Sequence, residues 1–217
     1  MTPSADLRAR VLAAASQEPT PTRAAIVARN LALLASGIVV PLLVFVSWGG
    51  IRSAPRPNTL VWETASGAFA VALTAAILAL SRGRSMLGRP GVALISLALG
   101  TPVVLFAWKV FFSSRYPGMM VEWPERPGLR CLTLSCLTAA WPLVAAVTAR
   151  RGSDPTHPRL TGAAIGAAIG AGVWVLVDLW CPVAYVPHLF VGHVLPFALC
   201  TAAGTLLGHF VIALRAA

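Results

Sequence analysis

Six long apolar runs are the feature that most constrains the fold of this 217-residue chain. Each run is about 20 residues long, the length at which a helix crosses the ~30 Å hydrocarbon core of a bilayer. Because lipid offers no hydrogen-bond partners, such a segment satisfies its own backbone as a helix. The apolar residues are continuous rather than alternating, which argues against a membrane β-barrel. We therefore predict an all-α polytopic membrane protein with six transmembrane helices in a bundle, near Ile26–Trp48, Leu60–Leu80, Gly91–Phe112, Cys131–Ala149, Leu160–Trp180 and Leu189–Leu214.

Composition supports a membrane location and argues against nucleic acid as a partner. Hydrophobic residues make up 57% of the chain and charged residues 11%, with a mean hydropathy of +0.77. A soluble domain of this size could not bury that much apolar sequence. The formal net charge of +10 comes from basic residues in the short loops, as in other membrane proteins. No Lys/Arg-rich run with interleaved aromatic residues is present, so we expect no direct binding of nucleic acid.

The distribution of arginine predicts the orientation. Eleven of the 17 basic residues lie in the N-terminal segment, the second and fourth loops and the C-terminal end, and at most six lie on the opposite side, counting Lys109 near that surface. The positive-inside rule therefore places both termini in the cytoplasm, and Cys131 and Cys181 face outward. The eleven are Arg8, Arg10, Arg23, Arg29, Arg82, Arg84, Arg89, Arg150, Arg151, Arg159 and Arg215.

Two parts of unequal size are expected. Residues 1–25 read as a cytoplasmic N-terminal tail, and residues 26–217 as the six-helix transmembrane domain. Leu7 and Val11 fall on one face at helical spacing, which indicates a short amphipathic helix that would gain stability by docking. A frayed tail is the alternative. The apolar patch from Val11 is too short for a signal peptide, so we expect this segment to be retained.

The fifth span carries Gly162, Gly166 and Gly170 at a strict four-residue spacing. Small residues at this spacing let helix backbones approach closely. They indicate helix packing, either within the bundle, which we favour for a chain with six helices, or between two chains in a homodimer.

The most distinctive chemistry is a pair of cysteines at the outer ends of two neighbouring spans. An antiparallel hairpin would bring Cys131 and Cys181 to the same face. Other ionisable groups lie at similar depth, and such groups inside spans are candidates for function: Asp178, His188, His193, Glu63 and Lys109.

Three interpretations of this outer cluster stay open. The thiols could form a disulfide, which requires Cα atoms within about 7 Å. They could bind a metal ion with His or Asp, although no tight C-x-x-C spacing is present. They could instead be small apolar fillers, with the charged groups extending to the surface. Cys136 and Cys200, the remaining cysteines, are predicted to be packing residues.

No enzyme signature is evident: the chain has no nucleophile elbow, phosphate loop or paired carboxylates, and we predict that it is not an enzyme. A transporter would be short and lack an evident duplicated half. A small membrane transporter, or a redox- or ion-handling membrane accessory protein, remains the alternative function.

From Cys131 onward the sequence resembles a known family. Cys131 opens the fourth span, a basic loop runs from Arg150 to Gly162, and a Gly/Ala-rich span ends at Cys181. Asp6-Leu7 followed by Val11-Leu12-Ala13-Ala14 resembles the family's leader. These features are similar to the NrsF-type six-helix integral-membrane anti-sigma factors, which restrain extracytoplasmic-function sigma factors. The resemblance covers nearly the whole chain in layout and is specific over Cys131 to Cys181. The chain departs from the family pattern at Trp180 and at Gly192-His193.

The resemblance implies a function in transcription regulation and stress response at the bacterial inner membrane. The cytoplasmic N-terminal segment would bind the sigma factor, with Leu7, Val11 and Leu12 as contacts, and keep it from RNA polymerase. Cys131 and Cys181 match the sensory pair, which would respond to metals or oxidants. No resident cofactor is implied, and a metal ion would act as the stress signal at the two cysteines.

Overall fold

The computed structural model describes residues 6, 9, 22–51, 57–81, 89–121, 128–151, 153, 156–181 and 183–213. These residues form helices and turns, with no strand among them. Six helical segments are long and apolar enough to cross a membrane, which confirms the predicted fold class. They are α2 (Arg23–Ser47), α3 (Asn58–Leu80), α4 (Gly91–Ser113), α5 (Leu129–Ala149), α6 (Pro158–Trp180) and a sixth segment over Val186–Ile212.

The predicted span limits differ from the observed ones by at most three residues, as at Ile26, where α2 already begins at Arg23. A short 3-10 helix, η1 (Pro117–Met119), follows α4. Contacts divide the chain into Met1–Ala32 and Leu33–Ala217, so the division falls inside α2. In the first unit the described residues are 6, 9 and 22–32, the last of which form the start of α2.

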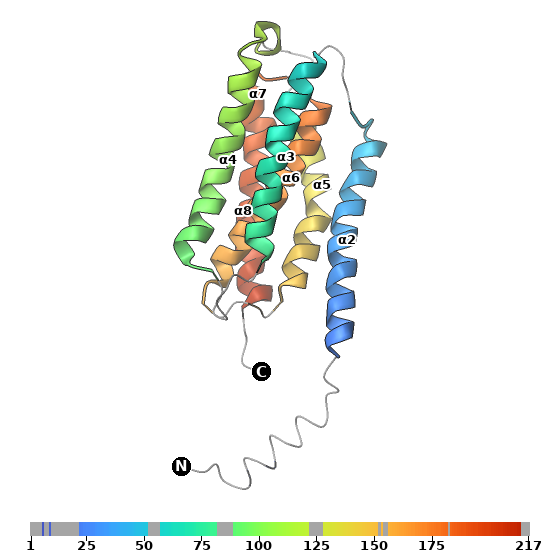
Figure 1. Cartoon of the computed structure of the whole chain (residues 1–217), viewed down its shortest axis with the longest axis vertical. Coiled ribbons are helices and arrows are strands. Elements are labelled where there is room, and N and C mark those ends of the chain that lie inside the picture. The colour runs from blue at the N-terminus through green and yellow to red at the C-terminus, as the bar shows by residue number, and fades with distance from the viewer. Residues whose placement is uncertain are drawn as a thin grey trace. The chain divides into compact units, whose positions relative to one another are not determined.

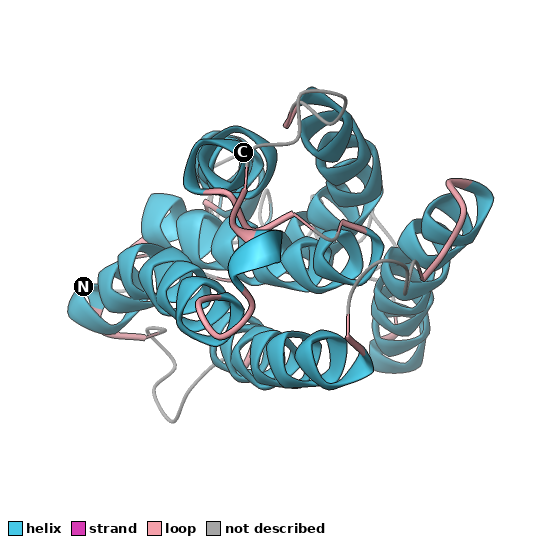
Figure 2. Ribbon diagram, turned by 90° about the horizontal axis from the view of Figure 1, so that it is seen from above, coloured by secondary structure: helices cyan, strands magenta, loops and turns pink. Residues whose placement is uncertain are grey.

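Helix α6 lies at the centre of the second unit. It packs against α3, α4, α5 and the last span (Figures 1 and 2). In the most apolar 18-residue stretch of each helix, 78% of the α6 residues are buried inside the bundle, against 56% for α5 and 33% for α3. The Gly/Ala-rich sequence of α6 permits this position, because small side chains let several neighbours approach one helix closely.

Three glycines of α6 face the last span of the same chain. A Cβ atom on Gly162 would overlap the carbonyl oxygen of Gly204, and one on Gly166 would overlap that of Cys200. A Cβ atom on Gly170 would lie 2.8 Å from the Phe197 ring. Within the described chain these glycines therefore serve packing inside the bundle.

The sixth span is not one regular helix. It consists of α7 (Val186–Leu189), the π-helix η2 (Phe190–Val194), α8 (Leu195–Leu207) and the π-helix η3 (Gly208–Ile212). The sequence predicted this span near Leu189–Leu214, and the structure divides it into α-helical and π-helical segments. Pro196 explains the first interruption, because it has no N–H to donate to the carbonyl of Gly192. The Ser135 hydroxyl, 3.5 Å away, donates to that carbonyl instead.

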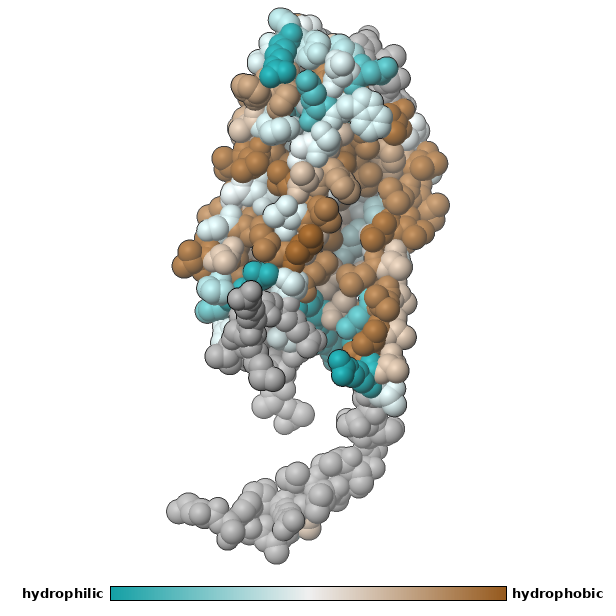
Figure 3. Space-filling model, viewed as in Figure 1, coloured by the Kyte–Doolittle hydropathy of each residue, from teal (hydrophilic) through white to brown (hydrophobic). Residues whose placement is uncertain are grey.

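Large apolar side chains cover the outside of the helices. Val92, Leu99 and Trp62 are each more than 60% exposed. Figure 3 shows brown, apolar side chains over much of the visible face. A soluble protein rarely exposes an apolar surface of this extent. The exterior therefore suits the lipid surroundings that the length and hydropathy of the helices indicate.

Candidate functional site: a buried cluster of two thiols and two imidazoles

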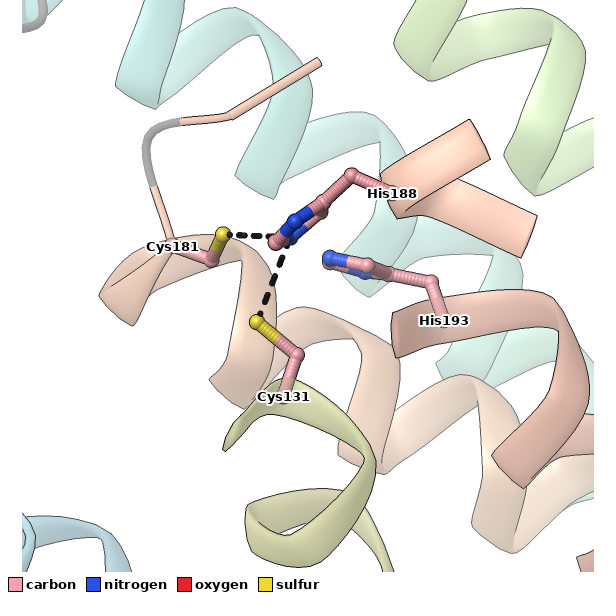
Figure 4. A group of neighbouring side chains, drawn as sticks. All are labelled: Cys131, Cys181, His188 and His193. Atoms are coloured by element: carbon pink, nitrogen blue, oxygen red, sulfur yellow. Dashed lines mark hydrogen bonds between the residues drawn. The ribbon is translucent and has the colours of Figure 1, made fainter. Parts of the chain in front are cut away.

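The structure brings Cys131 and Cys181 together. Cys131 lies in the first turn of α5, and Cys181 is the residue that ends α6. His188 and His193 complete a cluster in which one ligand atom from each residue, a sulfur or a ring nitrogen, lies within 4.8 Å of the other three. Each of the four side chains comes from the same end of the bundle, and they point toward a common centre (Figure 4).

His188 connects the two thiols. Its Nε2 atom lies 3.4 Å from the Sγ of Cys131 and 3.2 Å from the Sγ of Cys181. The histidine belongs to α7, the short helix that follows the turn after α6. It is 6% exposed, so these contacts are made away from solvent. One imidazole nitrogen therefore faces both sulfur atoms at hydrogen-bond distance.

His193 is the least satisfied member of the cluster. It is 3% exposed, and within the described part of the chain neither of its ring nitrogens has a hydrogen-bond partner. Its ring lies edge-on to Trp174, with centroids 5.1 Å apart, and 6.0 Å from the ring of His188. A buried polar group without a partner is rare, and each case calls for an explanation.

The π-helix η2 accounts for the position of His193. Five residues of an α-helix rotate a side chain about 140° away from its starting direction. In η2 the N–H of Leu195 donates to the carbonyl of Phe190, five residues earlier, so residues five apart are brought nearly above one another. His188 and His193 are five apart in the sequence and point into the same cluster.

Two glycines let the last span approach α5. A Cβ atom on Gly192 would lie 2.8 Å from the Cβ of Cys131 and 3.2 Å from the carbonyl oxygen of Gly128. A Cβ atom on Gly128 would lie 2.9 Å from the backbone nitrogen of Gly192. These distances are shorter than ordinary carbon contacts of about 3.5–4.0 Å. Gly128 and Gly192 are therefore required for the short distance between Cys131 and the two histidines.

The thiol of Cys181 is more acidic than an ordinary cysteine thiol. Its pKa lies well below the ordinary value, mainly because the Cys131 side chain makes a hydrogen bond to it. Burial raises the pKa, and His188 and His193 lower it further. The thiolate is the form that reacts and that binds metals. The surroundings of Cys181 therefore favour its chemically active form.

A buried ion pair lies one turn from the cluster. Lys109 of α4 and Asp178 of α6 are 2% and 1% exposed, and the ammonium group donates to the Asp178 carboxylate. Glu63 is different, because it is partly exposed and forms an ion pair with Arg115 at 3.6 Å. Of the three interpretations of this cluster, the one in which the charged groups extend to the surface is therefore wrong for Lys109 and Asp178, and both histidines are buried as well.

The remaining sequence predictions have mixed outcomes. Leu7, Val11 and Leu12, the expected contacts of a sigma factor, lie outside the described residues. Cys200 is buried as expected, whereas Cys136 is exposed on the outer side of α5, so its assignment as a packing residue is wrong. The reason is helical phase: the face of α5 that carries Cys131 and Leu134 points inward, and the face that carries Cys136 does not.

Sequence reasoning placed His188 and His193 near the thiols but did not select them as site residues. The signal that could have selected them is the combination of Pro196 with a five-residue spacing. Proline at that position disturbs the regular helix, and a π turn is one way to restore the hydrogen bonding.

Comparison with known proteins gives a family and no further relatives. Neither the curated proteins nor the solved structures contain a match to this chain. The family model described as negative regulator of sigma F, NrsF, matches residues 13–213, which is nearly the whole chain. That family is a class of regulators of sigma factors and not a class of enzymes. The chain therefore belongs to the NrsF family of negative regulators of a sigma factor.

Proposed function

We propose that the chain is a membrane anti-sigma factor of the bacterial inner membrane. It sequesters an extracytoplasmic-function sigma factor through its N-terminal segment and releases it on stress sensed at Cys131 and Cys181. The observation that carries the proposal is the family membership, which makes the chain a negative regulator of a sigma factor. The close approach of two buried thiols supplies the candidate sensor.

The N-terminal segment is the part best suited to bind a sigma factor. Residues 1–22 are the longest stretch outside the six membrane-length helices. Leu7 and Val11 have the spacing of an apolar helix face, and an amphipathic helix can dock in a groove of its partner. A segment that binds in this way would hold the sigma factor at the membrane surface.

The arginine distribution supports an orientation with both termini in the cytoplasm. Six crossings return the chain to the side on which it started. Arg159 lies in the first turn of α6, at its basic end, and Cys181 caps the opposite end. In this orientation the thiols face the periplasm, where metals and oxidants arrive first.

A pull-down from membranes tests the binding half of the proposal. The full-length protein and a version lacking residues 1–25 are compared, and bound proteins are identified by mass spectrometry. We expect a sigma factor with the full-length protein only. A sigma factor bound equally by both versions would contradict the role of the N-terminal segment, and its absence from both would contradict sequestration.

Cysteine variants test the sensing half. We expect Cys131→Ser together with Cys181→Ser to abolish the release of the sigma factor by cadmium or by oxidants, with membrane insertion unchanged. Cys136→Ser is the matched control, because this thiol lies on the same helix as Cys131 but is exposed on its outer side. A double variant that releases the sigma factor like the wild type would refute the sensor role.

A further inference from the structure

The cluster has the ligand set of a closed metal site. Two sulfur and two imidazole nitrogen donors lie within 4.8 Å of one another, and each donor residue is at most 6% exposed. Two buried nitrogens of His193 have no hydrogen-bond partner among the described residues, and Figure 4 shows this ring pointing toward the thiols. A cation at the centre would satisfy one of those nitrogens and both sulfur atoms.

We propose that Cys131, Cys181, His188 and His193 together bind one divalent cation of the zinc and cadmium class in a tetrahedral site. This inference rests on the proposed function, in that it names the chemical class of the signal which the thiols sense. It extends the site to two histidines that the sensor proposal does not include.

The distances fit tetrahedral coordination. Zinc lies about 2.3 Å from a thiolate sulfur and about 2.0–2.1 Å from an imidazole nitrogen, so the sulfur and nitrogen ligands of a tetrahedron are about 3.6 Å apart. The corresponding distances from His188 to the two sulfur atoms are 3.4 and 3.2 Å. Two sulfur ligands would be about 3.8 Å apart in the same geometry. Because all ligand atoms lie within 4.8 Å, closing the tetrahedron requires shifts of about 1 Å or less.

The donor types select the metal. Thiolate and imidazole ligands suit zinc and related borderline or soft cations, whereas magnesium and calcium prefer oxygen ligands. A site with four protein ligands leaves no position for a substrate, which is the arrangement of structural rather than catalytic zinc sites. The ligands therefore indicate a cation that changes conformation and not one that performs a reaction.

The ligands join three elements of the bundle, namely its fourth, fifth and sixth spans. Cys131 comes from α5, Cys181 from the end of α6, and the histidines from α7 and η2. A bound cation would fix the last span against the α5–α6 hairpin. A ligand shifts an equilibrium only by its difference in affinity for two arrangements, and this site exists only in the arrangement that brings the three elements together.

Cadmium titration of the purified full-length protein in detergent, with its thiols reduced, tests the site without any sigma factor. Thiolate-to-cadmium charge transfer absorbs in the ultraviolet and reports binding directly. We expect one cadmium ion per chain, displaced by zinc but not by magnesium. Cys131→Ser with Cys181→Ser should abolish the absorption, and His188→Gln and His193→Gln should each weaken binding at least tenfold. His209→Gln, at an exposed position of η3, and Cys136→Ser are matched controls with wild-type affinity.

X-ray absorption of the zinc-loaded wild type gives a result that does not depend on whether a variant folds. We expect a shell of two sulfur and two nitrogen ligands. A shell without nitrogen, wild-type affinity in both histidine variants, or no binding by the reduced wild type would each overturn the proposal. Cadmium binding without release of the sigma factor would contradict the proposed function but support the site. Release of the sigma factor by cadmium that binds the two cysteines with unchanged affinity in both histidine variants would overturn the four-ligand site but support the proposed function.

Discussion

The packing of α6 against the last span predicts that replacing glycine by alanine has opposite effects on stability at two positions of α6. Gly162 meets backbone, because a Cβ atom there would overlap the carbonyl oxygen of Gly204 and lie 2.8 Å from the Cα of Gly208. Gly172 lies ten residues later in α6, and a Cβ atom there would meet nothing within 4 Å. The same substitution, glycine to alanine, should therefore destabilise at one position and not at the other.

The distances set the size of the effect. Carbon atoms approach to about 3.5 Å, so Gly162→Ala requires α6 and the last span to separate by at least about 0.7 Å. Such a gap removes about a quarter to a half of the van der Waals attraction of each atom pair across the contact. If about 40 pairs, each contributing about 0.15 kcal/mol, lose about a third of their attraction, the packing energy falls by about 2 kcal/mol. Gly172→Ala loses nothing in packing and should gain up to about 1 kcal/mol from the higher helix propensity of alanine.

Unfolding by SDS, followed by far-ultraviolet circular dichroism, measures this difference in the purified protein. We expect the two variants to differ in free energy of unfolding by about 2–3 kcal/mol, with Gly162→Ala the less stable. A Gly162→Ala variant as stable as Gly172→Ala would refute the packing argument. If Gly162→Ala instead converted a dimer into a monomer of wild-type stability, the glycines would belong to an interface between chains.

Two further predictions concern the ion pair and the glycine beside Cys131. Asp178→Asn should lower the free energy of unfolding by about 3–5 kcal/mol because it leaves the Lys109 charge buried, while Lys109→Met combined with Asp178→Leu should cost less than the single change; additive losses in SDS unfolding would contradict this. Gly192→Ala should weaken cadmium binding about 10–100-fold. The added Cβ atom would lie only 2.8 Å from the Cβ atom of Cys131 and so forces η2 and its histidine away from that thiol. Gly118→Ala, which meets nothing within 4 Å, is the control for the titration, and equal affinities would contradict the positioning role.

The sequence predicted the six spans well because hydropathy and length are local properties. It also predicted that Cys131 and Cys181 meet, because two antiparallel helices joined by a short loop must bring the start of one to the end of the other. Neither inference required knowledge of how the bundle packs. For the same reason, the sequence could not show that α6 is the central helix, which depends on its contacts with α3, α4, α5 and the last span.

The histidines show where local reasoning ends. A regular helix would turn His193 away from His188, and the π turn that prevents this depends on Pro196 and on the Ser135 hydroxyl of another helix. The burial of Lys109 and Asp178 likewise depends on the pairing of α4 with α6. Long side chains near helix ends usually reach the surface, and only the partner across the bundle makes the buried position favourable.

The position of Cys181 bears on how a signal at the thiols could reach the other end of the molecule. The residue ends α6, the helix that packs against most of the others, and the α6–α8 contact is largely backbone against backbone at glycines. Such a contact has little side-chain freedom with which to absorb a displacement. Packed interfaces of this kind switch between discrete arrangements rather than deform gradually. We therefore expect a cation bound at Cys181 to move α6 as a unit, so that its basic end at Arg159 shifts together with its thiol end.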